Sequence, residues 1–194
     1  MTVLLIAGSP SLPSRSTALL DAVATRLAVR GARIERIVVR DLPATAVLTA
    51  DVSHPALQKA AAQVAHARAI VIATPVYKAA YSGVLKAFLD LLPQSALKAK
   101  TVLPLATGGS PHHMLALDYA LRPVLQSLSA RQILAGVYAT DSQVTLTPEG
   151  AYTLHPDLAL RLDDSAESLA VEGLHLPPAT GFEPVHFSRV RCSV

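Results

Sequence analysis

Apolar runs of strand length alternate along the chain with longer stretches whose apolar residues recur at helical spacing. The apolar runs lie at about residues 2–7, 34–39, 69–75, 101–109 and 132–139. Between them the helical spacing is clearest at Leu19, Leu20, Val23 and Leu27. We predict five strands, helices over about 16–29, 82–92, 112–128 and 156–171, and a further helix capped by Ser53 after a loop that contains Pro43.

Strict alternation of strands and helices in one chain is typical of an α/β protein with a parallel sheet and helices on both faces. The pattern alone leaves the strand order open between the two common doubly wound arrangements, of which the flavodoxin-like order 2-1-3-4-5 is one. We predict a single domain over residues 1–172 and a C-terminal surface tail over 173–194, which is rich in Pro and lacks periodicity. Ligands of such sheets bind beyond the carboxyl ends of the strands, so the loops after strands one, three and four are the candidate sites.

Composition narrows the class of protein further. The chain has 194 residues, of which 51% are hydrophobic and 16% are charged, and this excludes a disordered protein. No apolar run reaches the roughly eighteen residues of a membrane span, and no signal peptide is visible at the N-terminus. Cys192 is the single cysteine and allows no internal disulfide. We therefore expect a cytoplasmic protein without a membrane contact.

The charge pattern gives no sign of a nucleic-acid or metal site. The net charge is +3 and the pI is about 9.2, but the arginines are scattered and do not alternate with aromatic residues. His112 and His113 are adjacent, so their side chains diverge and make a poor pair of metal ligands. We expect neither a nucleic-acid partner nor a bound metal.

The segment AGSPSLPSRSTALL, residues 7–20, crowds hydroxyl groups and one arginine into the turn between the first strand and its helix. Such a turn offers free backbone amides and the positive end of the helix dipole, and Arg15 adds a charge that suits a phosphate dianion. A lone terminal phosphate fits this donor set better than a pyrophosphate, for which a glycine-rich turn suffices. The alternative is ordinary N-capping by Ser14 or Ser16, which needs no arginine.

The loops after strands three and four offer a place for a flat ring. In TPVYKAAYSG, residues 74–83, the stiff pair Pro75 and Val76 precedes two tyrosines that flank Lys78. In ATGGSPHH, residues 106–113, Gly108 and Gly109 let the backbone approach a ligand closely. The alternatives are tyrosines that simply cover the end of the sheet and a plain turn.

The chain resembles the NADPH-dependent FMN reductases of the flavodoxin-like superfamily over roughly residues 2–145. The resemblance is carried by the serine-rich turn, by the two loops just described, and by the segments VLPLATGGSPHHMLALDYALRPVL and DSQV. Within that family the resemblance is closest to the reductase component of two-component alkanesulfonate monooxygenase systems. It implies a flavodoxin-like three-layer sandwich with strand order 2-1-3-4-5 and the reduction of FMN by NADPH. It also implies release of reduced FMN to a partner flavin-dependent monooxygenase, and a homodimer or homotetramer.

The resemblance also assigns roles to individual residues. It implies that Ser9, Ser14, Arg15 and Ser16 hold the FMN phosphate. Pro75, Val76 and Tyr77 would contact the ribityl chain and the ring from one side, and Thr107, Gly108, Gly109 and Ser110 would border the ring from the other. Because hydride transfer asks mainly for oriented rings, we nominate no general acid or base.

Two further residues, Lys78 and Tyr119, are candidates for contacts around the flavin site. Lys78 is a candidate contact for an NADPH phosphate, although a solvated surface lysine is the plain alternative. In the related reductases a tyrosine in the matching helix accompanies a π-type bulge near the flavin and the subunit interface, and Tyr119 holds that place here. The alternative is an aromatic side chain that packs between helices. An apolar face on the predicted helix 82–92 could serve an interface or pack on its own sheet; it comprises Val84, Leu85, Phe88, Leu91 and Leu92.

Two other functions compete with the FMN reductase. One is an enzyme of the same fold that holds FMN tightly and reduces quinones, azo dyes or metal oxyanions. The other is a flavodoxin-type electron carrier without enzymatic activity, but such carriers are usually strongly acidic and this chain is basic.

Overall fold

The computed structural model describes residues 1–147 and 151–179 of the chain. Its central sheet runs β2 (Arg33–Val38), β1 (Thr2–Ala7), β3 (Ala69–Tyr77), β5 (Thr101–Gly108) and then a fifth strand in two pieces. All these neighbours pair in parallel. The predicted parallel sheet with order 2-1-3-4-5 is therefore confirmed, with the short β4 (Ala80–Tyr81) as an antiparallel addition to β3.

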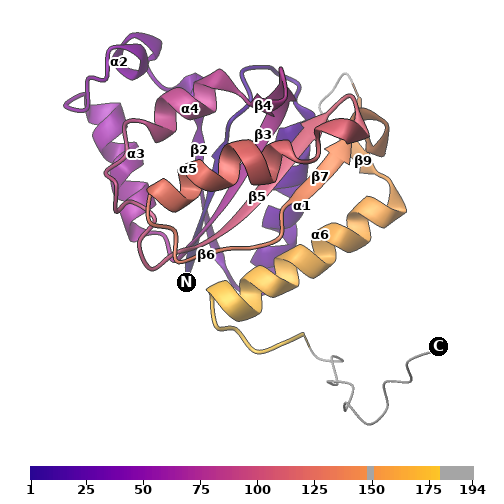
Figure 1. Ribbon diagram of the computed structural model, residues 1–194. Helices are drawn as coiled ribbons and strands as arrows, with labels where there is room; N and C mark the ends of the chain where they lie inside the picture. Colours follow the sequence, from indigo (N-terminus) through magenta and orange to yellow (C-terminus); the bar gives the residue numbers. More distant parts are fainter. Residues whose placement is uncertain (148–150, 180–194) are drawn as a thin grey trace.

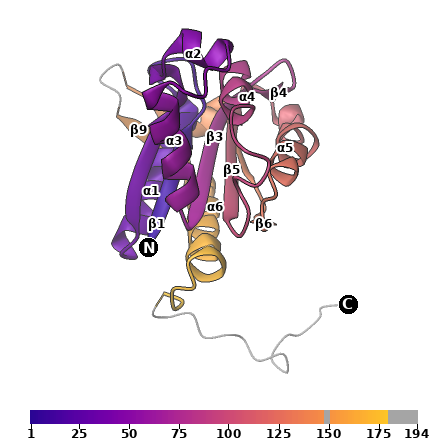
Figure 2. The same ribbon diagram turned by 90° about the vertical axis from the view of Figure 1, so that its left-hand side faces the viewer.

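Helices cover both faces of this sheet (Figures 1 and 2). Residues of β1 alternate between two cores: Val3 and Leu5 pack in one cluster, and Leu4 and Ile6 in the other. The first cluster includes α1 (Arg15–Val29) and α6 (Pro156–Ser168), and the second includes α3 (Pro55–His66), α4 (Gly83–Leu89) and α5 (Arg122–Ser127). The apolar run at the start of the chain is continuous because both of its faces are covered.

The fifth strand is interrupted where the sequence predicts one continuous element. β6 (Gln132–Ile133) and β7 (Val137–Thr140) both pair with β5, and the gap lies opposite Pro104. The Leu134 amide donates to the Val102 carbonyl of β5 at 2.9 Å. On β5, every second residue hydrogen-bonds toward the fifth strand, so the next residue after Val102 to do so is Pro104. Pro104 has no N–H to donate, and the ladder therefore stops there.

The predicted helix over 112–128 is also divided. It consists of a 3₁₀ turn, η2 (Pro111–His113), a π-helical turn, η3 (Leu117–Leu121), and then α5. Pro123 follows the π-helical turn and has no N–H for the carbonyl of residue 119, which favours a widened turn before it. A second π-helical turn, η5 (Leu169–Gly173), follows α6.

Short elements also lie in two regions for which the sequence predicts neither a strand nor a helix. The predicted loop with Pro43 contains the 3₁₀ turn η1 (Val39–Asp41) and the short helix α2 (Ala44–Leu48). Beyond the fifth strand, the 3₁₀ turn η4 (Asp141–Gln143) leads into a two-stranded antiparallel sheet formed by β8 (Val144–Leu146) and β9 (Tyr152–Leu154).

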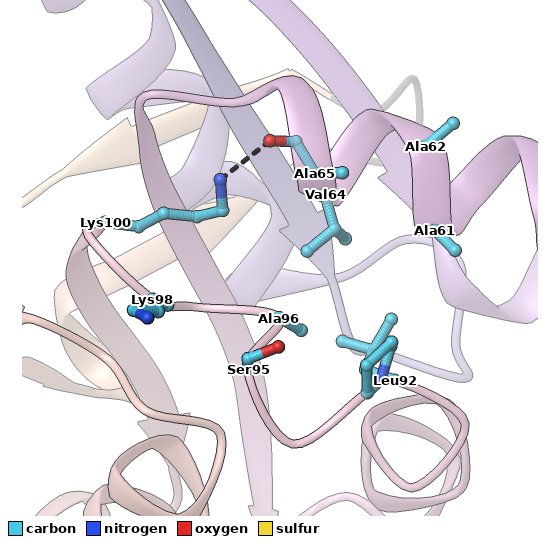
Figure 3. A pocket seen from close by; sticks show the side chains of 10 residues that line it. Ala61, Ala62, Val64, Ala65, Leu92, Ser95, Ala96, Lys98 and Lys100 are labelled. Carbon is cyan, nitrogen blue, oxygen red and sulfur yellow. Dashed lines mark hydrogen bonds between the residues drawn. The ribbon is translucent and has the colours of Figure 1, made fainter.

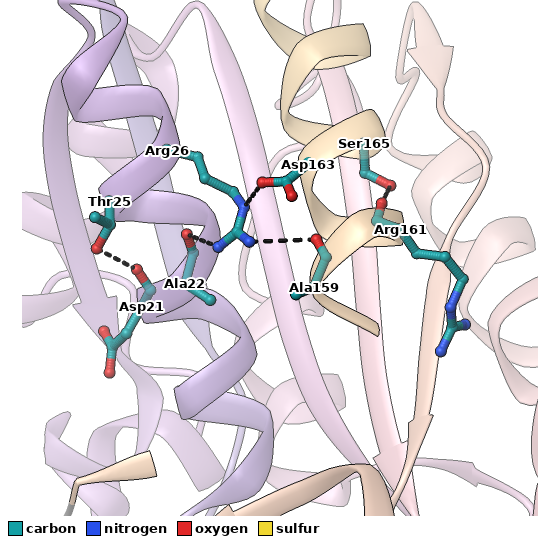
Figure 4. A network of polar contacts seen from close by, with 8 residues as sticks. All are labelled: Asp21, Ala22, Thr25, Arg26, Ala159, Arg161, Asp163 and Ser165. Carbon is teal, nitrogen blue, oxygen red and sulfur yellow. Dashed lines mark hydrogen bonds and ion pairs between the residues drawn. The ribbon is translucent and has the colours of Figure 1, made fainter. Parts of the chain in front are cut away.

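Ion pairs hold α6 against α1, and Figure 4 shows the one between Arg26 and Asp163. The Arg26 guanidinium donates to Asp163 Oδ1 at 2.5 Å and to the Ala159 carbonyl at 3.2 Å, and one turn further along Arg30 pairs with Glu167. Beyond α6, Leu174 is fully buried and Leu176 packs on the same cluster, so the chain continues to contribute to the core past residue 172. The rest of the predicted tail, residues 180–194 with Cys192, lies outside the described residues.

Candidate functional site

A cleft of about 220 Å³ opens at the carboxyl edge of the sheet, where the turns after β1, β3, β5 and β7 meet. All the residues predicted to hold FMN line it except Ser16 and Ser110, and sequence reasoning missed three others. The lining comprises Ser9, Ser11, Pro13, Ser14, Arg15, Pro75, Val76, Tyr77, Thr107, Gly108, Gly109 and Asp141.

The turn after β1 is pressed tightly against its neighbours. The Gly8 amide donates to the Ala73 carbonyl at 2.7 Å, and a Cβ at Gly8 would lie 2.9 Å from Leu85 Cβ. The buried Ser82 hydroxyl donates to the Gly8 carbonyl and accepts from the Leu85 amide, which caps α4. Only glycine fits this position, and the close fit fixes where the following serines lie.

Helix N-capping explains only one of the hydroxyl groups in the serine-rich turn after β1. Ser14 is the N-cap of α1 and accepts from the Thr17 amide at 3.3 Å, so the capping alternative holds for this residue. Ser16 is buried beneath it, with its hydroxyl 3.1 Å from that of Ser14. Ser9 is also buried and accepts from the Ser11 amide at 3.2 Å. The turn thus presents hydroxyls and the N-terminus of a long helix to the cleft.

Arg15 reaches across the cleft to the far wall. Its Nε donates to the Val144 carbonyl at 3.1 Å, and its Nη1 lies 3.7 Å from Asp141 Oδ2. The Arg15 side chain is 42% exposed, so it can still meet a ligand. The sequence predicts Asp141 at the end of the fifth strand. Its pairing with Arg15 could not be predicted, because the two residues are far apart in the chain and no local sequence pattern links them.

The loop after β3 is a tight hairpin. Tyr77 pairs with Ala80 across a two-residue turn formed by Lys78 and Ala79, whose φ angles are +49° and +63°. Tyr77 lines the cleft and is 48% exposed. Tyr81 packs against the core instead, and burial raises the pKa of its hydroxyl, so covering the sheet end is the role of this second tyrosine. Lys78 is exposed and lies outside the cleft lining.

The loop after β5 is held by Tyr138 of β7. The Tyr138 hydroxyl donates to the Ser110 carbonyl at 2.6 Å, and a Cβ at Gly108 would lie 2.5 Å from that hydroxyl. Ser110 accepts from the His112 amide and so caps η2, and its side chain does not line the cleft. Gly109 faces open space, where an added Cβ would meet only Asp141 at 3.8 Å. The cleft wall here is bare backbone, open to a flat ligand.

Tyr119 lies in the π-helical turn η3 and is 79% exposed. This exposure contradicts the alternative in which the tyrosine packs between helices. Met114 and Leu115, just before it, are also about half exposed. The apolar face predicted over 82–92, by contrast, packs mostly on the chain's own core: Leu85, Phe88 and Leu92 are buried in it and the partly buried Val84 packs against it, with α4 ending at Leu89.

A larger cavity of about 500 Å³ lies away from this edge, between α3 and the segment that precedes β5 (Figure 3). Lys100 is buried there and donates to the Ala65 and Ala67 carbonyls, each at 2.8 Å. Burial lowers the pKa of this amine, and the neighbouring Arg68 charge lowers it further. Because these carbonyls end α3, the lysine acts as a helix C-terminal cap.

The described residues carry neither a membrane-spanning helix nor a cluster of metal ligands. In residues 1–147 and 151–179, no helix is long and apolar enough to cross a membrane. Within the same described ranges, no three His, Cys, Asp or Glu side chains gather as ligands for a metal ion.

The donor set of the cleft fits a flavin mononucleotide. Hydroxyls, a partly exposed guanidinium and a helix N-terminus converge on one end, which is the chemistry that a terminal phosphate dianion requires. At the other end the lining consists of Pro75 and Val76 of β3 and of the glycine backbone that ends the neighbouring strand β5. Fold and cleft together define a flavodoxin-like nucleotide-binding protein.

Comparisons with known proteins agree with this class. A family model described as NADPH-dependent FMN reductase matches residues 1–145. An FMN reductase (NADPH) of Pseudomonas putida KT2440 is 49% identical over 173 residues, which cover 88% of this chain and 87% of that protein. The Escherichia coli K12 protein of the same name is 45% identical over 168 residues, 87% of each chain. The solved apo structure of the NADH:FMN oxidoreductase EMOB has a TM-score of 0.79 and 41% identity, covering 91% of this chain and 90% of its own.

The chain belongs to the NADPH-dependent FMN reductase family. It is thus an enzyme of the oxidoreductase class, in a family whose cofactors are FMN and NADPH. A Streptococcus pneumoniae TIGR4 flavodoxin with a TM-score of 0.61 and 16% identity shares the fold alone.

Proposed function

We propose that this chain reduces FMN with NADPH in the cleft at the carboxyl edge of the sheet. We further propose that it releases the reduced FMN to a flavin-dependent monooxygenase of the alkanesulfonate type. The observation that carries the proposal is the cleft itself, whose lining joins a hydroxyl-rich helix N-terminus and Arg15 to Pro75, Val76 and the backbone of Gly108 and Gly109.

In this proposal the turn after β1 binds the phosphate. Ser9 and Ser14 supply hydroxyls, the first amides of α1 supply backbone donors, and Arg15 supplies a positive charge. Ser16 acts indirectly, because its buried hydroxyl contacts that of Ser14 and holds it in place.

The two loops beyond hold the ring. When bound, FMN supplies the ring that accepts a hydride from NADPH. Pro75, Val76 and Tyr77 support one side of it, and the backbone of Thr107, Gly108 and Gly109 borders the other. Ser110 contributes through its carbonyl, which anchors the loop to Tyr138. The chain's residues orient the two substrates and need not exchange a proton with them.

Lys78 is the proposed contact for an NADPH phosphate. It sits at the tip of the β3–β4 hairpin, next to the half-exposed Tyr77, where its ammonium group is free to reach a ligand that enters from solvent. The choice of NADPH follows the names of the Pseudomonas putida KT2440 and Escherichia coli K12 relatives. EMOB and the 31% identical SfnF protein of Pseudomonas putida are named as NADH-dependent.

The exposed surface around Tyr119 supports a homodimer or homotetramer. Met114, Leu115 and Tyr119 lie within six positions of one another and are all at least 51% exposed. Exposed apolar side chains gathered in one region are typical of an interaction surface. In the proposed oligomer, Tyr119 is covered by a second copy and modulates the flavin site from there.

The first experiment uses protein purified without added flavin and follows NADPH oxidation in air while FMN is titrated. A nearly colourless protein whose rate rises with FMN and saturates supports the proposal. A yellow protein that ignores added FMN and turns over only with a quinone or dye contradicts it. Adding an alkanesulfonate monooxygenase and its substrate tests the second half: sulfite should appear only when the reductase, NADPH and FMN are all present.

A further inference from the structure

Arg15 is held in the cleft by two groups of very different strength. Its Nε donates to the Val144 carbonyl at 3.1 Å, an ordinary hydrogen bond that fixes the side chain across the cleft. Its Nη1 lies 3.7 Å from Asp141 Oδ2, whereas a charge-assisted hydrogen bond is about 2.8 Å long. The pair with Asp141 is therefore loose, and its partners are 42% and 49% exposed.

The position of Asp141 is fixed by its neighbours. The Gln143 side chain accepts from the Thr140 amide at 3.0 Å, and this capping box sets the start of η4 at the end of β7. The carboxylate is thereby kept in the cleft lining beside Gly109. Among the described residues that line the cleft, no other is acidic.

A phosphate bound at the serine-rich turn meets both members of this pair. Because the Val144 carbonyl already occupies Nε, the phosphate needs the two Nη groups, of which Nη1 lies beside Asp141. The carboxylate competes for those donors and also repels the dianion. Both effects weaken phosphate binding, and neither acts on a ligand that has no phosphate.

On the basis of the proposed function, we propose that Asp141 competes with the phosphate group of FMN for Arg15 and so keeps the flavin exchangeable. Asp141 is then a positioning residue that sets the affinity for the phosphorylated flavin, without contact with the reacting atoms. Such competition limits the affinity of the cleft for the FMN phosphate. An enzyme that releases its reduced flavin requires an affinity that is limited in this way.

The test measures dissociation constants of FMN and of riboflavin, which lacks the phosphate, by quenching of flavin fluorescence. We expect Asp141→Asn, which keeps the shape of the side chain, to bind FMN about three- to tenfold more tightly than the wild type. Riboflavin binding should stay within about twofold, because a merely structural effect would move both ligands. Asp163→Asn is the matched control, because it removes an acid paired with Arg26 on the same helix α1, away from the cleft.

A second arm tests the route through Arg15. In an Arg15→Gln background, Asp141→Asn should improve FMN binding much less than it does beside Arg15. An equal improvement in both backgrounds would overturn competition for Arg15, and so would an unchanged ratio of FMN to riboflavin affinity in the single variant. A wild-type chain that binds neither flavin would instead overturn the proposed function, and this inference with it.

Discussion

The hydroxyl of Tyr138 occupies the space that a side chain at position 108 would need. A Cβ on Gly108 would lie 2.5 Å from Tyr138 Oη but 3.4 Å from the ring carbon that carries it. The same hydroxyl donates to the Ser110 carbonyl at 2.6 Å. One oxygen atom therefore both requires glycine at the end of β5 and anchors the loop that follows.

This relationship predicts a non-additive pair of substitutions. Gly108→Ala should lower the free energy of unfolding by about 1–3 kcal/mol, because the new methyl group collides with a hydrogen-bonded hydroxyl. Tyr138→Phe alone should cost about 1 kcal/mol for the lost hydrogen bond. In the double variant the oxygen is gone and the contact relaxes, so the total should be clearly less than the sum. Urea unfolding of all four proteins measures this, and strict additivity would contradict it.

Alkaline pH should weaken the fold through the same tyrosine. Burial raises the pKa of the Tyr138 hydroxyl above its usual value near 10, and the nearby Asp141 charge raises it further. The unfolded chain then releases the proton at a lower pH than the folded chain does. The stabilisation that the protonated Tyr138 hydroxyl provides is therefore fully present below about pH 10. It is lost as the pH rises through the raised pKa of the folded chain.

Unfolding free energies measured by urea at a series of pH values from 8 to about 11 check this expectation. The wild type should lose stability across the upper part of this range, and Tyr138→Phe should lose less. Burial also raises the pKa of Tyr81 and Tyr152, so the variant keeps part of the slope. Identical pH profiles for the two proteins would refute the assignment.

Arg15→Gln should weaken FMN binding about 10- to 100-fold, because it removes a charged donor to the phosphate. Riboflavin binding should hardly change. Arg26→Gln is the matched control: it lies further along the same helix and pairs with Asp163, so it should lower stability without an effect on FMN affinity. Fluorescence titration of both variants with both flavins is the measurement. Equal losses for FMN and riboflavin would remove Arg15 from the phosphate site.

The sequence predicted the parts of this structure that depend on local pattern. The apolar run at Thr2–Ala7 had to be a strand covered on both faces, and the serine-rich turn after it had to open a helix at the carboxyl edge. The break in the fifth strand escaped prediction because its cause, Pro104, lies on the neighbouring strand. The bond from Arg15 to Val144 spans 129 positions, and no periodicity records such a contact.

The turn of the β3–β4 hairpin carries avoidable strain. Ala79 has a φ of +63°, a left-handed conformation that costs an L-residue about 1 kcal/mol and glycine almost nothing. Ala79→Gly should therefore raise the free energy of unfolding by up to about 1 kcal/mol. Ala80→Gly, one position later in β4, is the control and should lower it, because glycine weakens a strand. A loss of stability in Ala79→Gly would show that the turn has a different geometry.

Tyr119 and Leu121 lie in one π-helical turn, but truncating them should change the stability of the fold by very different amounts. Leu121 is fully buried, so Leu121→Ala should cost about 2–5 kcal/mol of unfolding free energy. Tyr119 is 79% exposed, so in dilute protein Tyr119→Ala should change stability by no more than about 0.5 kcal/mol. If Tyr119 meets a second copy of the chain, the same substitution should shift the assembly toward smaller species.

Sedimentation velocity over a range of protein concentrations separates the two effects. A Tyr119→Ala variant that stays folded but dissociates at concentrations where the wild type is oligomeric supports an interface at this turn. A variant that keeps the wild-type assembly would leave the exposed tyrosine without a subunit role. Leu115→Ala, a half-exposed neighbour in the same stretch, should give a smaller shift in the same direction, because less apolar area is removed from the contact.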